Sequence, residues 1–131
     1  MRVSLIGLMG ESQCFHGSTW LCYENVMSDA LDRLFATIIA RKGSDPSSSY
    51  TAKLLADGVE KCAKKFGEEA TETVIAAISS DKAELAKESA DVLYHLLVLW
   101  AASGVTPEEV YAVLRAREGQ SGLEEKASRK A

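Results

Sequence analysis

Five acidic residues stand at helical spacing in two clusters, and this arrangement is the part of the sequence best suited to chemistry. The first cluster is Glu68, Glu69 and Glu72, and the second is Glu88 and Asp91. Side chains three and four residues apart share one face of a helix. A hairpin around residues 79–81 would bring the two clusters to the same height. Converging carboxylates repel one another, and an oxygen-only ligand set suits Mg²⁺, for which Mn²⁺ can substitute.

The alternative is that these residues are ordinary solvated acids on helix surfaces, which is the favoured interpretation for any one glutamate. The five together argue against it, because like charges at these spacings destabilise a helix. No lysine stands four residues after any of them to relieve the repulsion. The apolar neighbours Val92 and Leu93 also place Glu88 and Asp91 at the edge of a buried stretch. A metal site is therefore the interpretation that we favour.

Basic residues precede the first acidic cluster by one to two turns and flank a loop further upstream. They are Arg41, Lys42, Lys61, Lys64 and Lys65. A divalent cation beside several cationic side chains suits a polyphosphate, because they share its negative charge. For the lysines taken alone, a solvated basic face is the favoured interpretation. His95, one turn after Asp91, is more typical of a hydrogen-bonded core histidine than of a ligand or base.

Helices must position these residues, because apolar side chains recur at helical spacing along most of the chain. The pattern predicts helices from about residue 28 to 42, from 50 to 57, from 59 to 78, from 82 to 102 and from 107 to 118. The composition of residues 43–49 predicts a loop, and Asp57-Gly58 marks a break between the second and third helices. Thr106-Pro107 starts the last helix. No alternating strand pattern occurs, so we expect an all-α antiparallel helical bundle of four to five helices, completed by dimerisation.

Residues 92–102 are apolar on almost every side except at His95. Eleven residues are too few to cross a bilayer, which needs about 20. A helix that is apolar all round is normally buried, and we expect this one to be buried in an oligomer core.

Composition bounds the remaining possibilities. The 131 residues are 47% apolar and 26% charged, which fits one globular domain rather than a disordered chain. The formal net charge of −4 argues against a nucleic-acid binder, and no membrane segment is expected. The three cysteines show no zinc-ligand spacing, and reduced thiols in a cytoplasmic protein are the simplest interpretation. We expect Cys62 to be a small helix residue rather than a nucleophile.

Residues 1–26 lack sustained periodicity. Our interpretation is that Met27 is the biological start, so that residues 1–26 are a non-core N-terminal extension and residues 27–131 form the domain with a polar C-terminal tail. The alternative is a loose arm that packs on a partner. A metal bound by Cys14, His16 and Cys22 is a further, weaker possibility.

Two segments resemble a known family. They are Lys64-Lys65-Phe66-Gly67-Glu68-Glu69-Ala70-Thr71-Glu72 and Glu88-Ser89-Ala90-Asp91-Val92-Leu93-Tyr94-His95-Leu96-Leu97-Val98-Leu99. Together with Arg41-Lys42, Ser49-Tyr50-Thr51 and residues 121–127, they resemble the phosphoribosyl-ATP pyrophosphatase family over about residues 29–130. The two acidic motifs alone mark the wider MazG-type superfamily of all-α pyrophosphatases, and the flanking residues make the narrower resemblance specific. Residues 1–26 match nothing in the family.

The resemblance implies an enzyme that hydrolyses phosphoribosyl-ATP to phosphoribosyl-AMP and pyrophosphate, the second step of histidine biosynthesis. It implies Mg²⁺ held by the five acids, with Glu69, Glu72 and Asp91 also candidates for catalysis and the five basic residues candidates for the phosphates. One carboxylate, or a hydroxide on the metal, would serve as base, and the choice stays open. A homodimer is also implied. Two alternatives remain: a MazG-type enzyme acting on another nucleoside triphosphate, and a non-catalytic helical dimerisation module.

Overall fold

The computed structural model describes residues 19–118, and side chains are described from residue 29 onward. Within this range the chain forms helices and no strand. The helices are α1 (Thr19–Ala40), α2 (Tyr50–Asp57), α3 (Val59–Ile78), α4 (Lys82–Ser103) and α5 (Pro107–Arg117). The predicted all-α class is therefore confirmed, as are the loop before Tyr50 and the break at Gly58. Residues 1–18 and 119–131, which include most of the predicted extension and the polar tail, lie outside the described residues.

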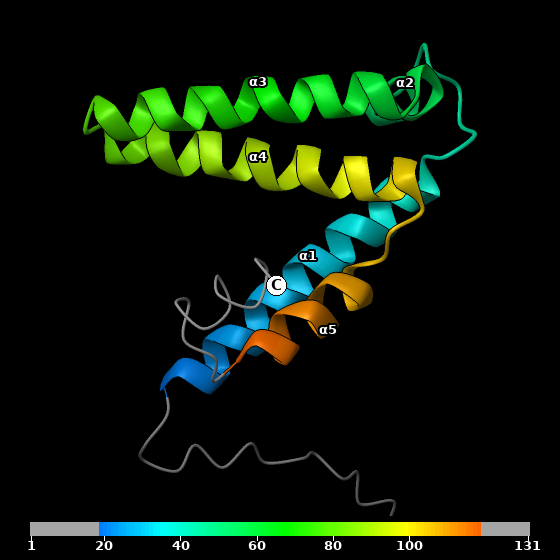
Figure 1. The fold of residues 1–131 in the computed structure, drawn as a ribbon. Coiled ribbons are helices and arrows are strands. Elements are labelled where there is room, and N and C mark those ends of the chain that lie inside the picture. The colour runs from blue at the N-terminus through cyan, green and yellow to red at the C-terminus, as the bar shows by residue number, and fades with distance from the viewer. Residues whose placement is uncertain (1–18, 119–131) are drawn as a thin grey trace, which may run out of the picture.

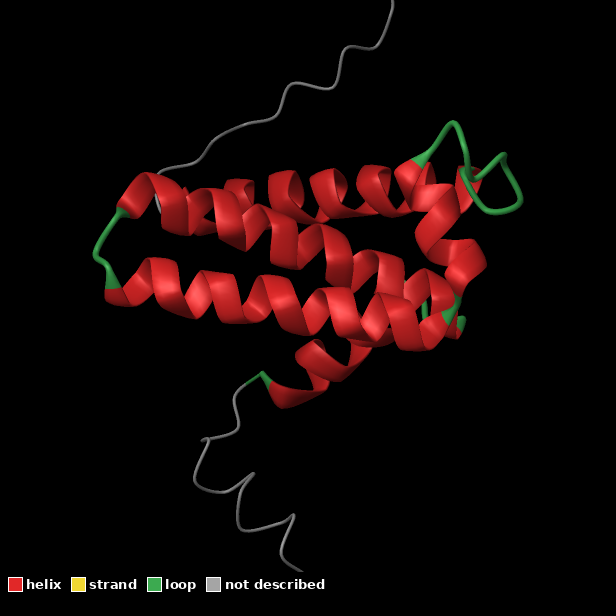
Figure 2. Ribbon diagram, turned by 90° about the horizontal axis from the view of Figure 1, so that it is seen from above, coloured by secondary structure: helices red, strands yellow, loops and turns green. Residues whose placement is uncertain are grey.

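The long hairpin of α3 and α4 is the part of the fold that positions the acidic residues. The two helices run antiparallel and side by side, as both ribbon views show (Figures 1 and 2). The turn between them is tight: Ser80 adopts a positive φ of 61°, and the Asp81 side chain accepts hydrogen bonds from the backbone N–H groups of Ala83 and Glu84. Capping by a short polar side chain fixes the start of α4 and therefore its register against α3.

The hydrophobic core lies at the end of the hairpin remote from this turn, where α1, α2, α3 and α4 meet. Its fully buried residues are Ile38, Leu54, Cys62, Leu97, Val98 and Ala101. The Cys62 thiol donates a hydrogen bond to the Leu54 carbonyl oxygen at 3.3 Å, and burial raises the pKa of that thiol. Cys62 is thus a small buried core residue, as predicted.

A break at Gly58 lets α2 fold back onto the hairpin. Gly58 has a φ of 91° and an extended ψ, a combination that residues with a Cβ rarely adopt. The Thr51 hydroxyl and the Tyr94 hydroxyl lie 2.7 Å apart, which fastens α2 to α4. The helix α5 begins with a capping box at Thr106 and Glu109, and the Tyr111 hydroxyl donates to Asp32 of α1 at 3.2 Å.

The first helix begins earlier than predicted. We expected a start capped by Ser28 or Asp29, but α1 begins at Thr19 and both residues lie inside it. The physical reason is that no glycine or proline interrupts residues 19–40, so the helix has no breaker at residue 28. Arg41 and Lys42 follow the helix rather than completing its last turn.

No single helix in the described part of the chain is both long and apolar enough to cross a membrane; only α4 and α5 taken together, across a bend of 111°, match by length and composition.

Candidate active site

Three carboxylates from the two predicted clusters converge between α3 and α4. One oxygen each of Glu69, Glu88 and Asp91 lies within 4.8 Å of the other two. Glu69 comes from the middle of α3, whereas Glu88 and Asp91 come from one face of α4. The antiparallel hairpin therefore brings the two acidic clusters to the same height, as predicted from a turn around residues 79–81.

The other two predicted acids lie at the border of this group. Glu72 lines a shallow cavity of about 270 Å³ together with Ile75, Ala76, Ser79, Glu84 and Glu88. The Glu68 carboxylate instead faces Lys64 and Lys65. Three of the five acids thus form the centre, Glu72 lies beside it, and Glu68 is held at its edge by lysines.

Glu88 is the buried member of the centre, and its neighbours disfavour its charged form. Glu88 is only 7% exposed. A hydrogen bond with the Glu84 side chain and burial raise the pKa of the Glu88 carboxyl, and the charge of Glu72 adds to the rise. The Lys87 ammonium contacts both Glu84, at 3.0 Å, and Glu88, at 3.3 Å. We had not singled out Glu84 or Lys87 as site residues, although the i, i+4 spacing of Glu84 and Glu88 is the signal that could have found them.

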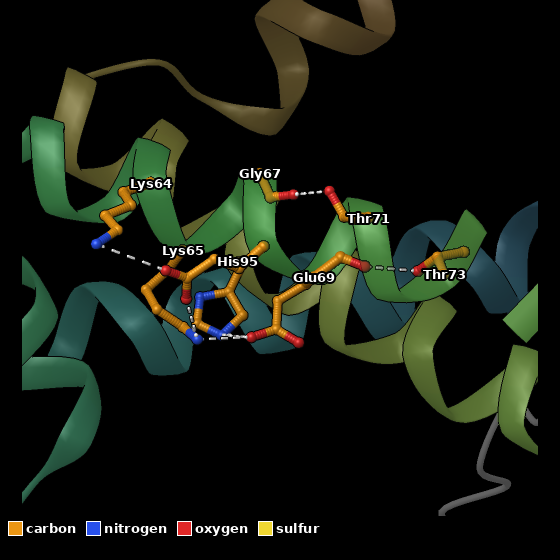
Figure 3. A network of polar contacts seen from close by, with 8 residues as sticks. Lys64, Lys65, Gly67, Glu69, Thr71, Thr73 and His95 are labelled. Carbon is orange, nitrogen blue, oxygen red and sulfur yellow. Dashed lines mark hydrogen bonds and ion pairs between the residues drawn. The ribbon is translucent and has the colours of Figure 1, made fainter. Parts of the chain in front are cut away.

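A lysine that precedes the acids on α3 relieves the repulsion among them. The Lys65 ammonium lies 2.8 Å from Glu68 Oε2 and 2.9 Å from Glu69 Oε1 (Figure 3). The two hydrogen bonds to these carboxylates raise the pKa of Lys65, and the bond from Lys65 lowers the pKa of Glu68. The lysine that relieves the repulsion therefore stands four residues before Glu69 and not four residues after it.

The remaining predicted basic residues lie further from the centre. Lys64 is 3.9 Å from Glu68, and Lys61 acts on Glu68 only through its charge. Arg41 and Lys42 follow α1, and within the described range neither forms an ion pair with a carboxylate. The structure thus brings Lys64 and Lys65 to the acids and does not bring Arg41 or Lys42 there.

His95 is buried against the centre and is not an ordinary hydrogen-bonded core residue. Its Nε2 lies 3.7 Å from Glu69 Oε1, too far for a normal hydrogen bond, and its buried Nδ1 has no partner among the described residues. Burial lowers the pKa of His95, which favours the neutral form of the ring. Tyr94 and Tyr50 meet the ring edge-on, at centroid distances of 4.9 and 6.2 Å.

The three converging carboxylates fit a hard divalent cation. Each supplies a charged oxygen donor, and the donor set holds no thiolate. Such ligands suit Mg²⁺ or Mn²⁺ better than softer metals. The hydrogen bond with Glu84 and burial raise the pKa of Glu88 and disfavour its charged form, which a bound cation would favour.

Comparison with known proteins is consistent with this geometry. Residues 31–118 match the model of a family described as phosphoribosyl-ATP pyrophosphohydrolase. The chain is 67% identical over 99 residues to the phosphoribosyl-ATP pyrophosphatase of Cereibacter sphaeroides, covering 76% of this chain and 96% of that protein. It is 66% identical over 99 residues to the protein of that name from Parvibaculum lavamentivorans, covering 76% of this chain and 91% of that protein. For the protein of that name from Azospirillum brasilense, the identity is 56% over 107 residues, covering 82% of this chain and 96% of that protein. The family match spans most of the described residues and includes every acid of the site, so this chain belongs to the phosphoribosyl-ATP pyrophosphohydrolase family of enzymes.

Proposed function

We propose that this chain hydrolyses phosphoribosyl-ATP to phosphoribosyl-AMP and pyrophosphate, with Mg²⁺ as the cofactor. One water molecule is consumed, and the bond that breaks joins the α and β phosphates of the nucleotide. This reaction is the second step of histidine biosynthesis. The observation that carries the proposal is the convergence of Glu69, Glu88 and Asp91 within 4.8 Å in a chain of this family.

The converging carboxylates would hold the cation. Glu69, Glu88 and Asp91 each have an oxygen directed to the shared centre, and Glu72 lies close enough for its charge to act on Glu88. When bound, the cation would neutralise charge on the phosphoryl oxygens and make a nearby water more acidic. We keep Glu68 as an outer member of the set, because its carboxylate faces Lys64 and Lys65 and does not belong to the converging group.

The side chains around the centre would bind the phosphates and accept a proton. Lys61 and Lys64 precede the acids on the same helix and supply positive charge for a polyphosphate. Among the three candidate catalytic residues, Glu72 lines the cavity without belonging to the converging group. It can therefore orient the attacking water and take its proton, while Glu69 and Asp91 serve as ligands. Arg41 and Lys42 remain candidates for phosphates that extend toward the end of α1.

A homodimer in the cytoplasm is part of the proposal. Val74, Ile75 and Ile78, on the outer half of α3, are exposed in the single chain, and Ile78 is 79% exposed. Exposed apolar side chains clustered on one helix are typical of a protein interface.

The test is a substrate panel. The full chain is incubated with phosphoribosyl-ATP and, separately, with ordinary ribo- and deoxyribonucleoside triphosphates, each with Mg²⁺ and with EDTA, and products are identified by ³¹P NMR. We expect Mg²⁺-dependent release of pyrophosphate from phosphoribosyl-ATP and slower turnover of the others. Faster turnover of an ordinary triphosphate would identify a different MazG-type enzyme, and no turnover at all would favour a dimerisation module.

A further inference from the structure

Lys65 is paired with one of the carboxylates that a cation would need. Its ammonium contacts Oε1 of Glu69, a member of the converging group, and Oε2 of Glu68. The Lys65 side chain is 23% exposed and Glu69 is 12% exposed, so water screens this pair only partly. Figure 3 shows the lysine folded toward Glu69 and His95.

The neighbouring lysines do not share this arrangement. Lys64 lies 3.9 Å from Glu68 with a side chain that is 69% exposed. Lys87 reaches Glu88, but at 3.3 Å and from a largely solvated position. Exposed pairs of that kind contribute little to stability. Lys65 is therefore the cation most firmly held at the carboxylate centre.

A divalent cation and the Lys65 ammonium would repel each other if both were bound to the Glu69 carboxylate. Both are positive, and like charges a few ångströms apart repel strongly in a partly desolvated site. A lysine side chain is flexible and carries three donors, so it can exchange one acceptor for another at small cost. A polyphosphate bound beside the metal would offer such acceptors within reach.

We propose that Lys65 is a resident counter-cation of the carboxylate centre, which the divalent metal displaces from Glu69 and which then pairs with the phosphate groups of the substrate. This inference rests on the proposed function and deepens it. It assigns one of the five basic residues a specific role, in which a single side chain couples metal binding to polyphosphate binding. Metal and polyphosphate then each strengthen the binding of the other.

The test measures metal binding in the absence of substrate. Mn²⁺ affinity is determined by electron paramagnetic resonance for the full chain and for Lys65→Met, Lys65→Arg and Lys64→Met, after circular dichroism has verified that each is folded. We expect Lys65→Met to bind Mn²⁺ about fivefold or more tightly than the unchanged chain, in the range typical of coupled sites. Lys64→Met loses the same charge from the same helix and should change the affinity much less. Lys65→Arg keeps a competing cation and should stay close to the unchanged chain.

A second measurement tests whether the displaced Lys65 ammonium binds phosphate groups. At saturating Mn²⁺, pyrophosphate affinity is measured by isothermal titration calorimetry, and Lys65→Met should bind it about tenfold more weakly, a coupling of the usual size. Equal Mn²⁺ affinity in Lys65→Met and Lys64→Met, or weaker binding in Lys65→Met, would overturn the inference while leaving the metal site intact. Absence of Mn²⁺ binding in every protein, the unchanged chain included, would overturn both the inference and the proposed cofactor.

Discussion

At the scale of single residues, the carboxylates of the site differ in what surrounds them. Glu88 is buried against Glu84 and has a raised pKa, whereas Glu68 is solvated, paired with lysine and has a lowered pKa. Both are glutamates on a helix face, and what separates their properties is the neighbour one turn away on the same helix, Glu84 or Lys65, together with the burial of Glu88. The spacing of the acids could therefore predict that a centre exists, but it could not predict which three residues form it.

The first prediction concerns Glu72 and Asp91. Glu72→Gln and Asp91→Asn should each lower turnover by about two orders of magnitude or more, which is roughly 3 kcal/mol of lost transition-state stabilisation. Each substitution keeps the shape of the side chain and removes one negative charge from a crowded group. The melting temperature of the metal-free variants should therefore not fall, because repulsion is relieved.

The control is Glu60→Gln, which makes the same chemical change at an exposed position in the first turn of α3. Its turnover should equal that of the unchanged chain. Steady-state rates at saturating Mg²⁺ and thermal unfolding followed by circular dichroism give the two readouts. Near-normal rates for both Glu72→Gln and Asp91→Asn would remove the carboxylates from the mechanism.

Among the elements, the helices whose ends carry strong local signals were predicted closely. Gly58 and Gly104 adopt positive φ values where the predicted helices end, and Asp81 and Thr106 cap the helices that follow them. The start of α1 was predicted wrongly because it has no such signal: Ser28 and Asp29 are good capping residues, yet they lie within a stretch free of breakers. The contact of Lys65 with Glu69 could have been predicted from their i, i+4 spacing. The Nδ1 of His95, which has no partner within residues 29–118, has no local signature, because the ring of this α4 residue lies against Glu69 of α3 and Tyr50 of α2.

The capping box of α5 supports the second prediction. The Thr106 hydroxyl accepts a hydrogen bond from the Glu109 backbone N–H, and Thr106→Ala removes this cap. The loss should lower the free energy of unfolding by about 1 kcal/mol, the usual value of an N-cap, while Thr106→Ser should retain most of it. Chemical denaturation at pH 7 measures both, and an unchanged midpoint for Thr106→Ala would show that α5 does not depend on its cap.

The same box gives a pH dependence with a definite sign. The Glu109 carboxylate accepts hydrogen bonds from the Thr106 backbone N–H and hydroxyl, which lower the pKa of Glu109 below its ordinary value of 4.5. Because the folded pKa is the lower one, this stabilisation is fully present above the unfolded value and is lost as the pH falls through the folded value. The difference in melting temperature between the unchanged chain and Glu109→Gln should therefore shrink between pH 7 and pH 3.

Across the whole molecule, one chain buries only part of its apolar surface. Leu97, Val98 and Ala101 are already buried within the single chain. The apolar half of α4 therefore depends less on a second chain for its burial than its composition indicated. Among the large apolar side chains of residues 29–118, the most exposed are instead Val74, Ile75 and Ile78 of α3, close to the turn of the hairpin. Composition could predict that such a surface exists, but the packing of α1 and α2 decides which helix exposes it.

The third prediction is that this surface holds a homodimer together. Light scattering at micromolar concentration should give twice the 14.1 kDa mass of the chain. Ile78→Glu places a charge where the interface would be desolvated and should shift the mass to that of one chain. Val113→Glu, at an exposed apolar position on α5, is the matched control and should leave the dimer unchanged. A single-chain mass for the unchanged protein would contradict the prediction.

The fourth prediction is that residues 1–26 are dispensable. A chain that begins at Met27 loses the first turns of α1 but keeps Leu31, Leu34, Phe35 and Ile38, which pack on the core. It should retain the turnover of the full chain and melt within a few degrees of it, as expected when less than about 1 kcal/mol is lost from a domain of this size. Thermal unfolding and initial rates measure both, and a large loss of either would show that the removed segment packs on the body.

A metal titration of the reaction itself is the most direct test of the proposed metal-dependent hydrolysis. Protein stripped with EDTA and dialysed is supplied with phosphoribosyl-ATP, and the initial rate of pyrophosphate release is followed as Mg²⁺ is added. We expect no measurable rate without metal, a saturable rise with Mg²⁺, partial or full replacement by Mn²⁺, and a much weaker response in Asp91→Asn. Full activity in the metal-free sample would contradict this proposal, because the convergence of Glu69, Glu88 and Asp91 would then have no part in the chemistry.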